Sequence, residues 1–172
     1  MRRDADAAAV RRFARELGRA TTTPARLYLV GGASAVIEGW RSSTLDIDLR
    51  LEPDDDALLR HLPRLKERLD VNIELASPMD FVGELPGWRE RSPFLFRESR
   101  IDVHHFDFCS QAMAKLERGF EQDVADVEAM VATGLVEPTQ LLALYERIED
   151  GLFRFPAVDP ASLRAAVEAL TA

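Results

Sequence analysis

Two aspartates separated by one residue are the part of the sequence best suited to chemistry. Asp46 and Asp48 lie in the segment Leu45 to Leu51, where apolar and polar residues alternate strictly. Such alternation predicts a β-strand whose polar side chains share one face, with their Cα atoms about 6.6 Å apart. Two carboxylates in this arrangement are suited to hold a hard divalent cation such as Mg²⁺ or Mn²⁺. The competing interpretation is the solvated face of an amphipathic strand.

A third carboxylate would complete a site for two metal ions, which can hold the attacking and leaving oxygens of a phosphoryl transfer. Glu74 is the first candidate, because it occupies a polar position in the alternating segment Val71 to Leu75. Asp102, in the polar phase of a later strand, is the second candidate. The alternative role for Glu74 is a surface carboxylate paired with an arginine.

A pair of glycines precedes the aspartates. Gly31 and Gly32 follow the apolar run Leu27 to Val30 and come before a short helix-compatible segment, Ala33 to Glu38. Without side chains, the backbone here can approach a ligand closely and direct N–H groups at a phosphate. Ser34 can add a hydroxyl. The segment has neither the GK[ST] of a P-loop nor the G-x-G-x-x-G of a Rossmann turn.

Lys115 and Asp126 are the polar groups of interest in the second half of the chain. A helical repeat begins at Gln111, and residues eleven apart on one helix return to nearly the same face. The buried stripe of this helix is predicted to contain Met113, Leu116, Phe120 and Val124. Lys115 and Asp126 are then either active-site groups or an ion pair on an exposed helix face.

The composition places these groups in an ordinary globular protein. The 172 residues are 47% hydrophobic and 30% charged, which excludes a disordered chain and suffices for one core with a helical appendage. A net charge of -8 argues against a broad surface for duplex nucleic acid. The single cysteine, Cys109, and the lack of a signal peptide or a long apolar stretch predict a cytoplasmic protein without a membrane span. The cations are nearly all arginines, which is typical of GC-rich bacterial coding.

Strand-like and helix-like segments together predict an α+β fold. The expected strands are 27–30, 45–51, 71–75, 94–97 and 101–108. The expected helices are 4–17, 33–38, one that follows 54–56 and is kinked or shortened by Pro63, 111–131, 138–150 and 160–170. We expect a catalytic domain over 1–109 and a helical C-terminal extension over 110–172 that packs on it.

The residues around the glycines and aspartates also carry a resemblance. Leu29-Val30-Gly31-Gly32, Gly39-Trp40-Arg41-Ser42-Ser43-Thr44 and Leu45-Asp46-Ile47-Asp48-Leu49 resemble the signature of the nucleotidyltransferase superfamily related to DNA polymerase β. That signature is a hydrophobic residue, two small residues, a short helix and an Asp-x-Asp strand. The match is most similar to the AbiEii-type toxin branch and its small bacterial relatives, and it extends from about Leu27 to the Lys and Asp residues of 115–127.

The resemblance implies a mixed β-sheet flanked by helices and a set of site residues with assigned roles. The implied metal ligands, for Mg²⁺ or Mn²⁺, are Asp46, Asp48 and Glu74, where Glu74 replaces the Asp of many superfamily members. The implied contacts to a nucleoside triphosphate are Gly31, Gly32, Ser34, Arg41 and Ser43, with Lys115 as a further catalytic residue that contacts phosphate.

The sequence therefore favours an enzyme that moves a nucleoside monophosphate from a triphosphate to a hydroxyl. The resemblance suggests a tRNA 3′ end or a protein as acceptor, and the toxin of a toxin–antitoxin pair, with a cognate antitoxin as partner. A catalytically silent relative that acts by binding, as a nucleotide sensor or an antitoxin, is the alternative. A metal-dependent phosphohydrolase, which would release phosphate rather than pyrophosphate, is a third possibility.

Overall fold

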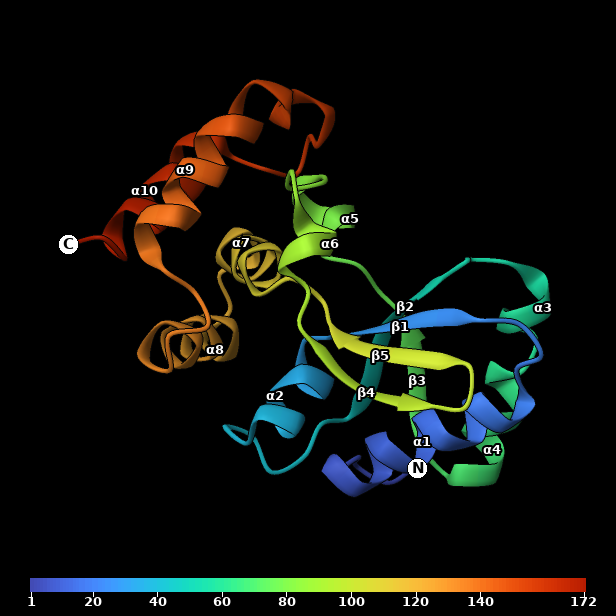
Figure 1. Cartoon of the computed structure of the whole chain (residues 1–172). Coiled ribbons are helices and arrows are strands. Elements are labelled where there is room, and N and C mark those ends of the chain that lie inside the picture. Colours follow the sequence, from blue (N-terminus) through green and yellow to red (C-terminus); the bar gives the residue numbers. More distant parts are fainter. The chain divides into compact units, whose positions relative to one another are not determined.

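Five strands form one mixed sheet in the computed structural model, which describes residues 1–172 (Figure 1). Their order in the sheet is β3-β2-β1-β5-β4. The strands are β1 (Ala25–Val30), β2 (Asp46–Glu52), β3 (Asn72–Leu75), β4 (Phe94–Glu98) and β5 (Ile101–His105). The central strand β1 runs antiparallel to β2 and parallel to β5, while β3 is parallel to β2 and β4 is antiparallel to β5.

Four helices belong to the same compact unit as the sheet, which comprises residues 1–76 and 92–106. They are α1 (Ala7–Ala20), α2 (Gly32–Glu38), α3 (Asp56–Leu59) and α4 (Leu62–Leu69). The carboxylate of Asp6 accepts a hydrogen bond from the Ala9 amide at 2.8 Å, so α1 begins three residues later than the sequence indicates. Pro63 lies in the first turn of α4, where a missing N–H is tolerated, and the predicted helix is divided into α3 and α4.

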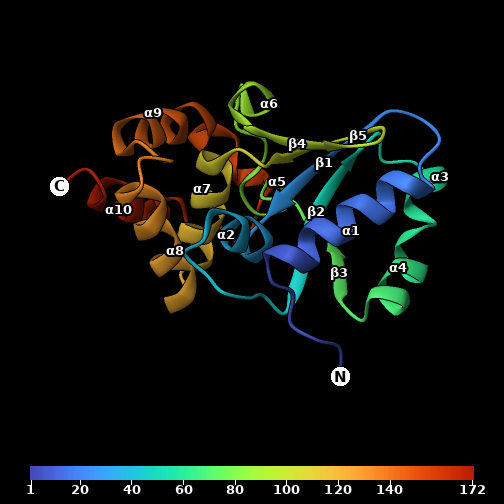
Figure 2. The same cartoon turned by 60° about the horizontal axis from the view of Figure 1, so that its bottom comes forward.

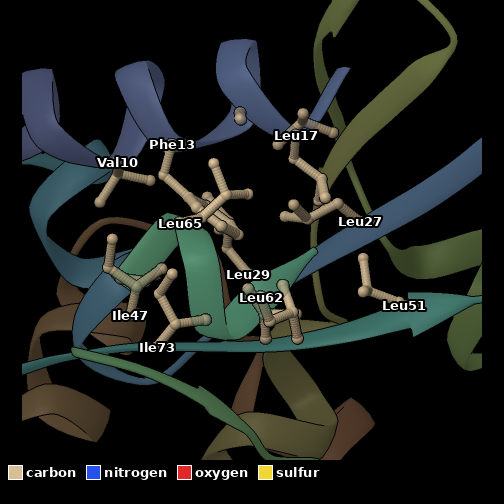
Figure 3. Packing of buried hydrophobic residues seen from close by; sticks show 14 of the residues in the cluster. Val10, Phe13, Leu17, Leu27, Leu29, Ile47, Leu51, Leu62, Leu65 and Ile73 are labelled. Atoms are coloured by element: carbon tan, nitrogen blue, oxygen red, sulfur yellow. The ribbon is translucent and has the colours of Figure 1, made fainter. Parts of the chain in front are cut away.

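The hydrophobic core lies between one face of the sheet and these helices. In β1 and β2 the inward residues alternate along each strand, as the period-2 pattern predicts, and α1 contributes Val10, Phe13 and Leu17 from one stripe. Figure 2 shows α1 running along the sheet, and Figure 3 shows its side chains meeting those of α4 and the strands. The opposite face of β2 carries the polar residues.

A second compact unit, residues 77–91 and 107–172, is entirely helical. Its helices are α5 (Met79–Val82), α6 (Trp88–Arg91), α7 (Phe108–Arg118), α8 (Glu121–Ala132), α9 (Pro138–Ile148) and α10 (Pro160–Ala169), with a 3₁₀ helix η1 (Glu149–Arg154). Asp107 caps α7 by accepting hydrogen bonds from the amides of Cys109 and Ser110. The segment 83–93, predicted as a loop, contains the short helix α6.

The α+β fold class is confirmed: a mixed five-stranded sheet is flanked by helices. The single helix predicted over 111–131 is wrong, because Gly119 adopts a left-handed conformation (φ 68°) that ends α7 before α8 begins. The last predicted strand is also too long, since it ends at His105. The predicted domain boundary at residue 109 stays a prediction. None of the helices combines the length and the apolar character needed to cross a membrane.

The position of the core predicts that truncating two phenylalanines of the sheet unit will have very different effects on the free energy of unfolding. Phe13 is fully buried, whereas Phe94 is 57% exposed. We expect Phe13→Ala to lower the free energy of unfolding by about 3 to 5 kcal/mol, because it removes buried surface and leaves a cavity. Phe94→Ala should cost less than about 1 kcal/mol. Urea denaturation checks both values, and equal losses would contradict this placement of the core.

Candidate active site

The face of the sheet that points away from the hydrophobic core carries the acidic residues. Asp46 and Asp48 of β2 are half-buried there, between inward-facing neighbours. Glu74 of β3 is exposed and pairs in register with Asp48. Because neighbouring strands lie about 4.8 Å apart, Asp48 and Glu74 project from adjacent positions of the same face. The three candidate carboxylates thus lie on the same face of two neighbouring strands.

The glycine turn at the end of β1 lies beside the second aspartate. Val30, the last residue of β1, pairs in register with Asp48. Gly31 follows with a φ of 58°, a left-handed conformation that favours glycine. A Cβ placed on Gly31 would lie 3.3 Å from Oδ2 of Asp48. The carboxylate therefore reaches the backbone of the turn.

Gly32 is enclosed by residues of the loop between α2 and β2. A Cβ on Gly32 would overlap the Thr44 hydroxyl, and it would lie 3.4 Å from Nη1 of Arg41. Thr44 Oγ1 also donates a hydrogen bond to the carbonyl of Asp46 at 3.0 Å. The guanidinium of Arg41 and the carboxylate of Asp48 are thus both close to the two glycines. Ser43, half-buried, lies in the same loop.

The donor set suits magnesium by its chemistry. Mg²⁺ is usually held by one or two carboxylates, while phosphate oxygens and water complete its octahedron. Asp46 and Asp48 supply two carboxylates from one face of β2. No three His, Cys, Asp or Glu side chains converge closely enough to hold a metal ion by themselves. The predicted magnesium site therefore relies on ligands from a bound triphosphate and from water.

Asp102 lies toward the other end of this sheet face. Arg97 binds it through two hydrogen bonds, Nε to Oδ1 at 2.5 Å and Nη2 to Oδ2 at 3.1 Å, and these bonds lower the pKa of Asp102. Across β1, Asp102 aligns with Glu52, four residues along β2 from Asp48, and both line a cavity of about 600 Å³. This placement favours Glu74 over Asp102 as a third metal ligand.

A buried histidine connects α2 to the sheet. The imidazole of His105, 1% exposed, lies between the Ser34 hydroxyl (Nδ1 to Oγ, 2.9 Å) and the Glu38 carboxylate (Nε2 to Oε1, 2.7 Å). The Ser34 hydroxyl is also 3.0 Å from the carbonyl oxygen of Leu29. Ser34 is fully buried, so its hydroxyl serves these internal contacts. Its predicted contact with a triphosphate stays a prediction.

Burial lowers the pKa of His105, because the imidazolium would lose hydration, while the nearby Glu38 carboxylate opposes this shift. The imidazole is then neutral at pH 7. Since a carboxylate can only accept, the neutral ring carries its proton on Nε2 and donates it to Glu38. Nδ1 can then only accept, so the single Ser34 hydroxyl proton is shared between Nδ1 at 2.9 Å and the Leu29 carbonyl oxygen at 3.0 Å.

Lys115 lies in the helical unit, within a buried network of charges. Its Nζ is 2.7 Å from Oδ2 of Asp126 and 3.2 Å from Oδ1 of Asp123, and all three residues are less than 10% exposed. Arg118 pairs with the other oxygen of Asp123 at 3.1 Å. The geometry supports the ion-pair interpretation, although the pair is buried and joins two helices. A catalytic role for Lys115 stays a prediction.

The predicted buried stripe of the second half is corrected by the break at Gly119. Phe120 and Val124 are exposed, at 63% and 39%, whereas Asp126 faces inward together with Val127 and Met130. Lys115 and Asp126 still meet, because α7 and α8 pack against each other. The eleven-residue spacing on one continuous helix is not the reason.

Two features of the site were not assigned from the sequence. The Thr44 hydroxyl packs on Gly32, and its only sequence signal is the position directly before the alternating Asp-x-Asp strand. The contact of His105 with Ser34 and Glu38 joins residues 67 and 71 positions apart, and no local pattern indicates it.

A strand that ends in two glycines, beside the second aspartate of an Asp-x-Asp strand, is the arrangement that the nucleotidyltransferase signature describes. The family model "Nucleotidyltransferase of unknown function (DUF6036)" matches residues 7–153, and the chain belongs to this family. The superfamily assignment is confirmed, whereas closeness to the AbiEii-type branch stays a prediction. No curated protein and no solved structure matches the chain.

The buried histidine predicts a pH dependence of stability. His105 binds a proton less readily in the folded protein than at its ordinary pKa of 6.5, so the unfolded state takes up more protons as the pH falls through 6.5. The stability that depends on neutral His105 is present above this pH and is lost on acidification. We expect the stability advantage of the wild type over His105→Gln to shrink between pH 7.5 and 5.5, by at most about 1.4 kcal/mol per pH unit. Urea titrations measure this difference, and an advantage that grows on acidification would contradict a lowered pKa.

The charge network predicts that Lys115 is needed for stability. Lys115→Met removes the ammonium that contacts both buried carboxylates, of which Asp123 also pairs with Arg118, and should destabilise the protein by about 3 to 5 kcal/mol. Lys66→Met is the matched control, because the side chain of Lys66 lies outside any such network, and it should cost less than about 1 kcal/mol. Adding Asp123→Asn and Asp126→Asn to Lys115→Met should recover at least half of the loss. Thermal and urea unfolding test the series, and a neutral Lys115→Met would argue against a buried network.

Proposed function

We propose that the protein is a Mg²⁺-dependent nucleotidyltransferase that moves a nucleoside monophosphate from a nucleoside triphosphate to an acceptor hydroxyl. The observation that carries this proposal is the approach of Asp48 to the glycine turn, with Oδ2 3.3 Å from the Cβ position of Gly31. A metal held by the carboxylate would then be adjacent to phosphates held by the turn. Membership of a nucleotidyltransferase family supports the same reaction class.

In the proposed site, Asp46, Asp48 and Glu74 hold the metal, which would neutralise phosphate charge and orient the reacting oxygens. The backbone amides of Gly31 and Gly32 bind the triphosphate. Arg41, whose Nη1 lies 3.4 Å from the Cβ position of Gly32, supplies a cation beside the same turn. Ser34, Ser43 and Lys115 are further proposed contacts, as the resemblance implies.

The proposed reaction needs positioning and charge neutralisation more than covalent chemistry. The acceptor oxygen attacks the α-phosphorus and forms a new P–O bond. The bond between the α-phosphorus and the bridging oxygen breaks, and pyrophosphate leaves with that electron pair. The hydroxyl proton passes to solvent. The proposed acceptor is a tRNA 3′ end or a protein hydroxyl, and the proposed setting is the bacterial cytoplasm, as the toxin of a pair with a cognate antitoxin.

A second candidate is nucleotide binding without turnover. It is favoured by the exposure of Glu74 and by the lack of three converging ligand side chains. Calorimetry with nucleoside triphosphates and Mg²⁺ separates the two functions, because the silent relative binds nucleotide but releases no pyrophosphate.

The proposal predicts the effect of removing one metal ligand. In reactions with α-³²P-labelled nucleoside triphosphates, Mg²⁺ and cell extract, Asp46→Asn and Asp48→Asn should each lower label transfer by at least about 100-fold. Asp54→Asn is the control, because Asp54 is exposed just beyond β2, and it should retain activity within about threefold. Omission of Mg²⁺ should abolish transfer by the wild type. Transfer that persists in both aspartate variants would rule out the assigned site.

A further inference from the structure

We propose that His105 is a positioning residue that holds the glycine turn in the shape required to bind a polyphosphate. The inference rests on the proposed function, because it assigns a role to the turn as a phosphate site. It concerns a side chain that does not itself reach the nucleotide. The imidazole acts through Ser34 and Glu38 of α2.

His105 is the last residue of β5 and pairs in register with Leu29 of β1. Its two ring nitrogens reach two positions on α2, Ser34 near the start of the helix and Glu38 at its end. A single buried ring therefore contacts both ends of a seven-residue helix. This arrangement fixes α2 relative to the central strands of the sheet.

The hydrogen bonds continue from α2 back to β1 and enclose the glycines. The Ser34 hydroxyl lies 3.0 Å from the Leu29 carbonyl oxygen, which also accepts a hydrogen bond from the Phe106 amide at 2.8 Å. Leu29 and Ser34 stand on either side of the four residues 30–33. Leu29, before the turn, pairs in register with His105, and Ser34, after the turn, contacts the His105 ring.

The turn needs such support because its backbone is unfavourable for most residues. Gly31 has φ 58° and ψ -125°, outside the regions that L-residues commonly adopt. The Gly31 carbonyl accepts the first hydrogen bond of α2, from the Ala35 amide at 3.0 Å. A shift or rotation of α2 would therefore move the Gly31 peptide directly, and with it the amides proposed to bind phosphate.

The chemistry of imidazole explains why histidine suits this position. A neutral ring donates through one nitrogen and accepts through the other, which matches a carboxylate on one side and a hydroxyl on the other. Glutamine can offer the same pair of functions, with its NH₂ toward Glu38 and its carbonyl toward Ser34. Leucine fills a similar volume but offers neither. The two substitutions separate hydrogen bonding from packing.

The test combines a nucleotide-free readout with binding. In ¹H–¹⁵N spectra of the full chain, His105→Leu should displace the Gly31 and Gly32 amide signals, whereas His105→Gln should leave them near their wild-type positions. In calorimetry with Mg²⁺ and each of ATP, CTP, GTP and UTP, His105→Leu should weaken the tightest interaction about tenfold. His105→Gln should change it less than about twofold.

Leu51→Ala controls for a general loss of stability. Leu51 is 1% exposed near the far end of β2, away from the glycine turn, and its truncation should destabilise the unit without changing nucleotide affinity more than about twofold. Unchanged glycine signals and affinity in His105→Leu would overturn the positioning role. An equal loss of affinity in Leu51→Ala would do the same, because the effect would then follow stability alone.

Two further outcomes are distinguishable. If His105→Leu does not fold, Glu38→Leu replaces it, because that partly exposed side chain can be removed without opening the core. Glu38→Leu should displace the same two glycine signals and weaken nucleotide binding about threefold, and unchanged signals would overturn the proposal. If the wild type binds none of the four nucleotides, the proposed function fails, while the glycine signals still decide whether His105 positions the turn.

Discussion

The antiparallel pairing of Val30 with Asp48 is the constraint on which the candidate site depends. It places the end of the central strand beside the second aspartate, so the turn that follows Val30 cannot avoid the carboxylate. A slip of one residue in this register would move the carboxylate to the core face of the sheet. The alternating leucines and isoleucines of β1 and β2 prevent that slip, because it would expose the core. Core packing and site geometry are consequently set by the same register.

The helical unit contains a buried group of charged side chains. Lys115, Asp123 and Asp126 are buried together, and burial of separate charges would be costly without close partners. The distances of 2.7 and 3.2 Å satisfy the ammonium with two carboxylates, one turn apart on α8. Such a network selects one packing of α7 on α8, since a shifted helix would leave a charge unpaired. Its charges therefore contribute to the specificity of helix packing.

Patterns with a short period predicted most of the sheet and the face on which the candidate carboxylates lie. The strict alternation around Asp46 and Asp48 gave β2 almost to the residue, and the Gly-Gly pair marked the end of β1. The helical repeat from Gln111 predicted one helix where the structure has two, because apolar residues keep the same spacing across the break at Gly119. Strand alternation made Asp102 a second candidate ligand, since a strand pattern gives the face of a side chain but not the arginine that pairs with it. The buried contacts of His105 depend on strand order, which a single sequence does not reveal.

The close packing of Thr44 against Gly32 has a consequence for how the family can vary. Any side chain at position 32 would need the space that the threonine hydroxyl occupies, so the two sites can only diversify as a pair. The same hydroxyl donates a hydrogen bond to the Asp46 carbonyl, and a compensating change at position 44 would therefore remove or alter a contact of Asp46. A relative that has serine at position 32 should accordingly have a residue smaller than threonine at position 44.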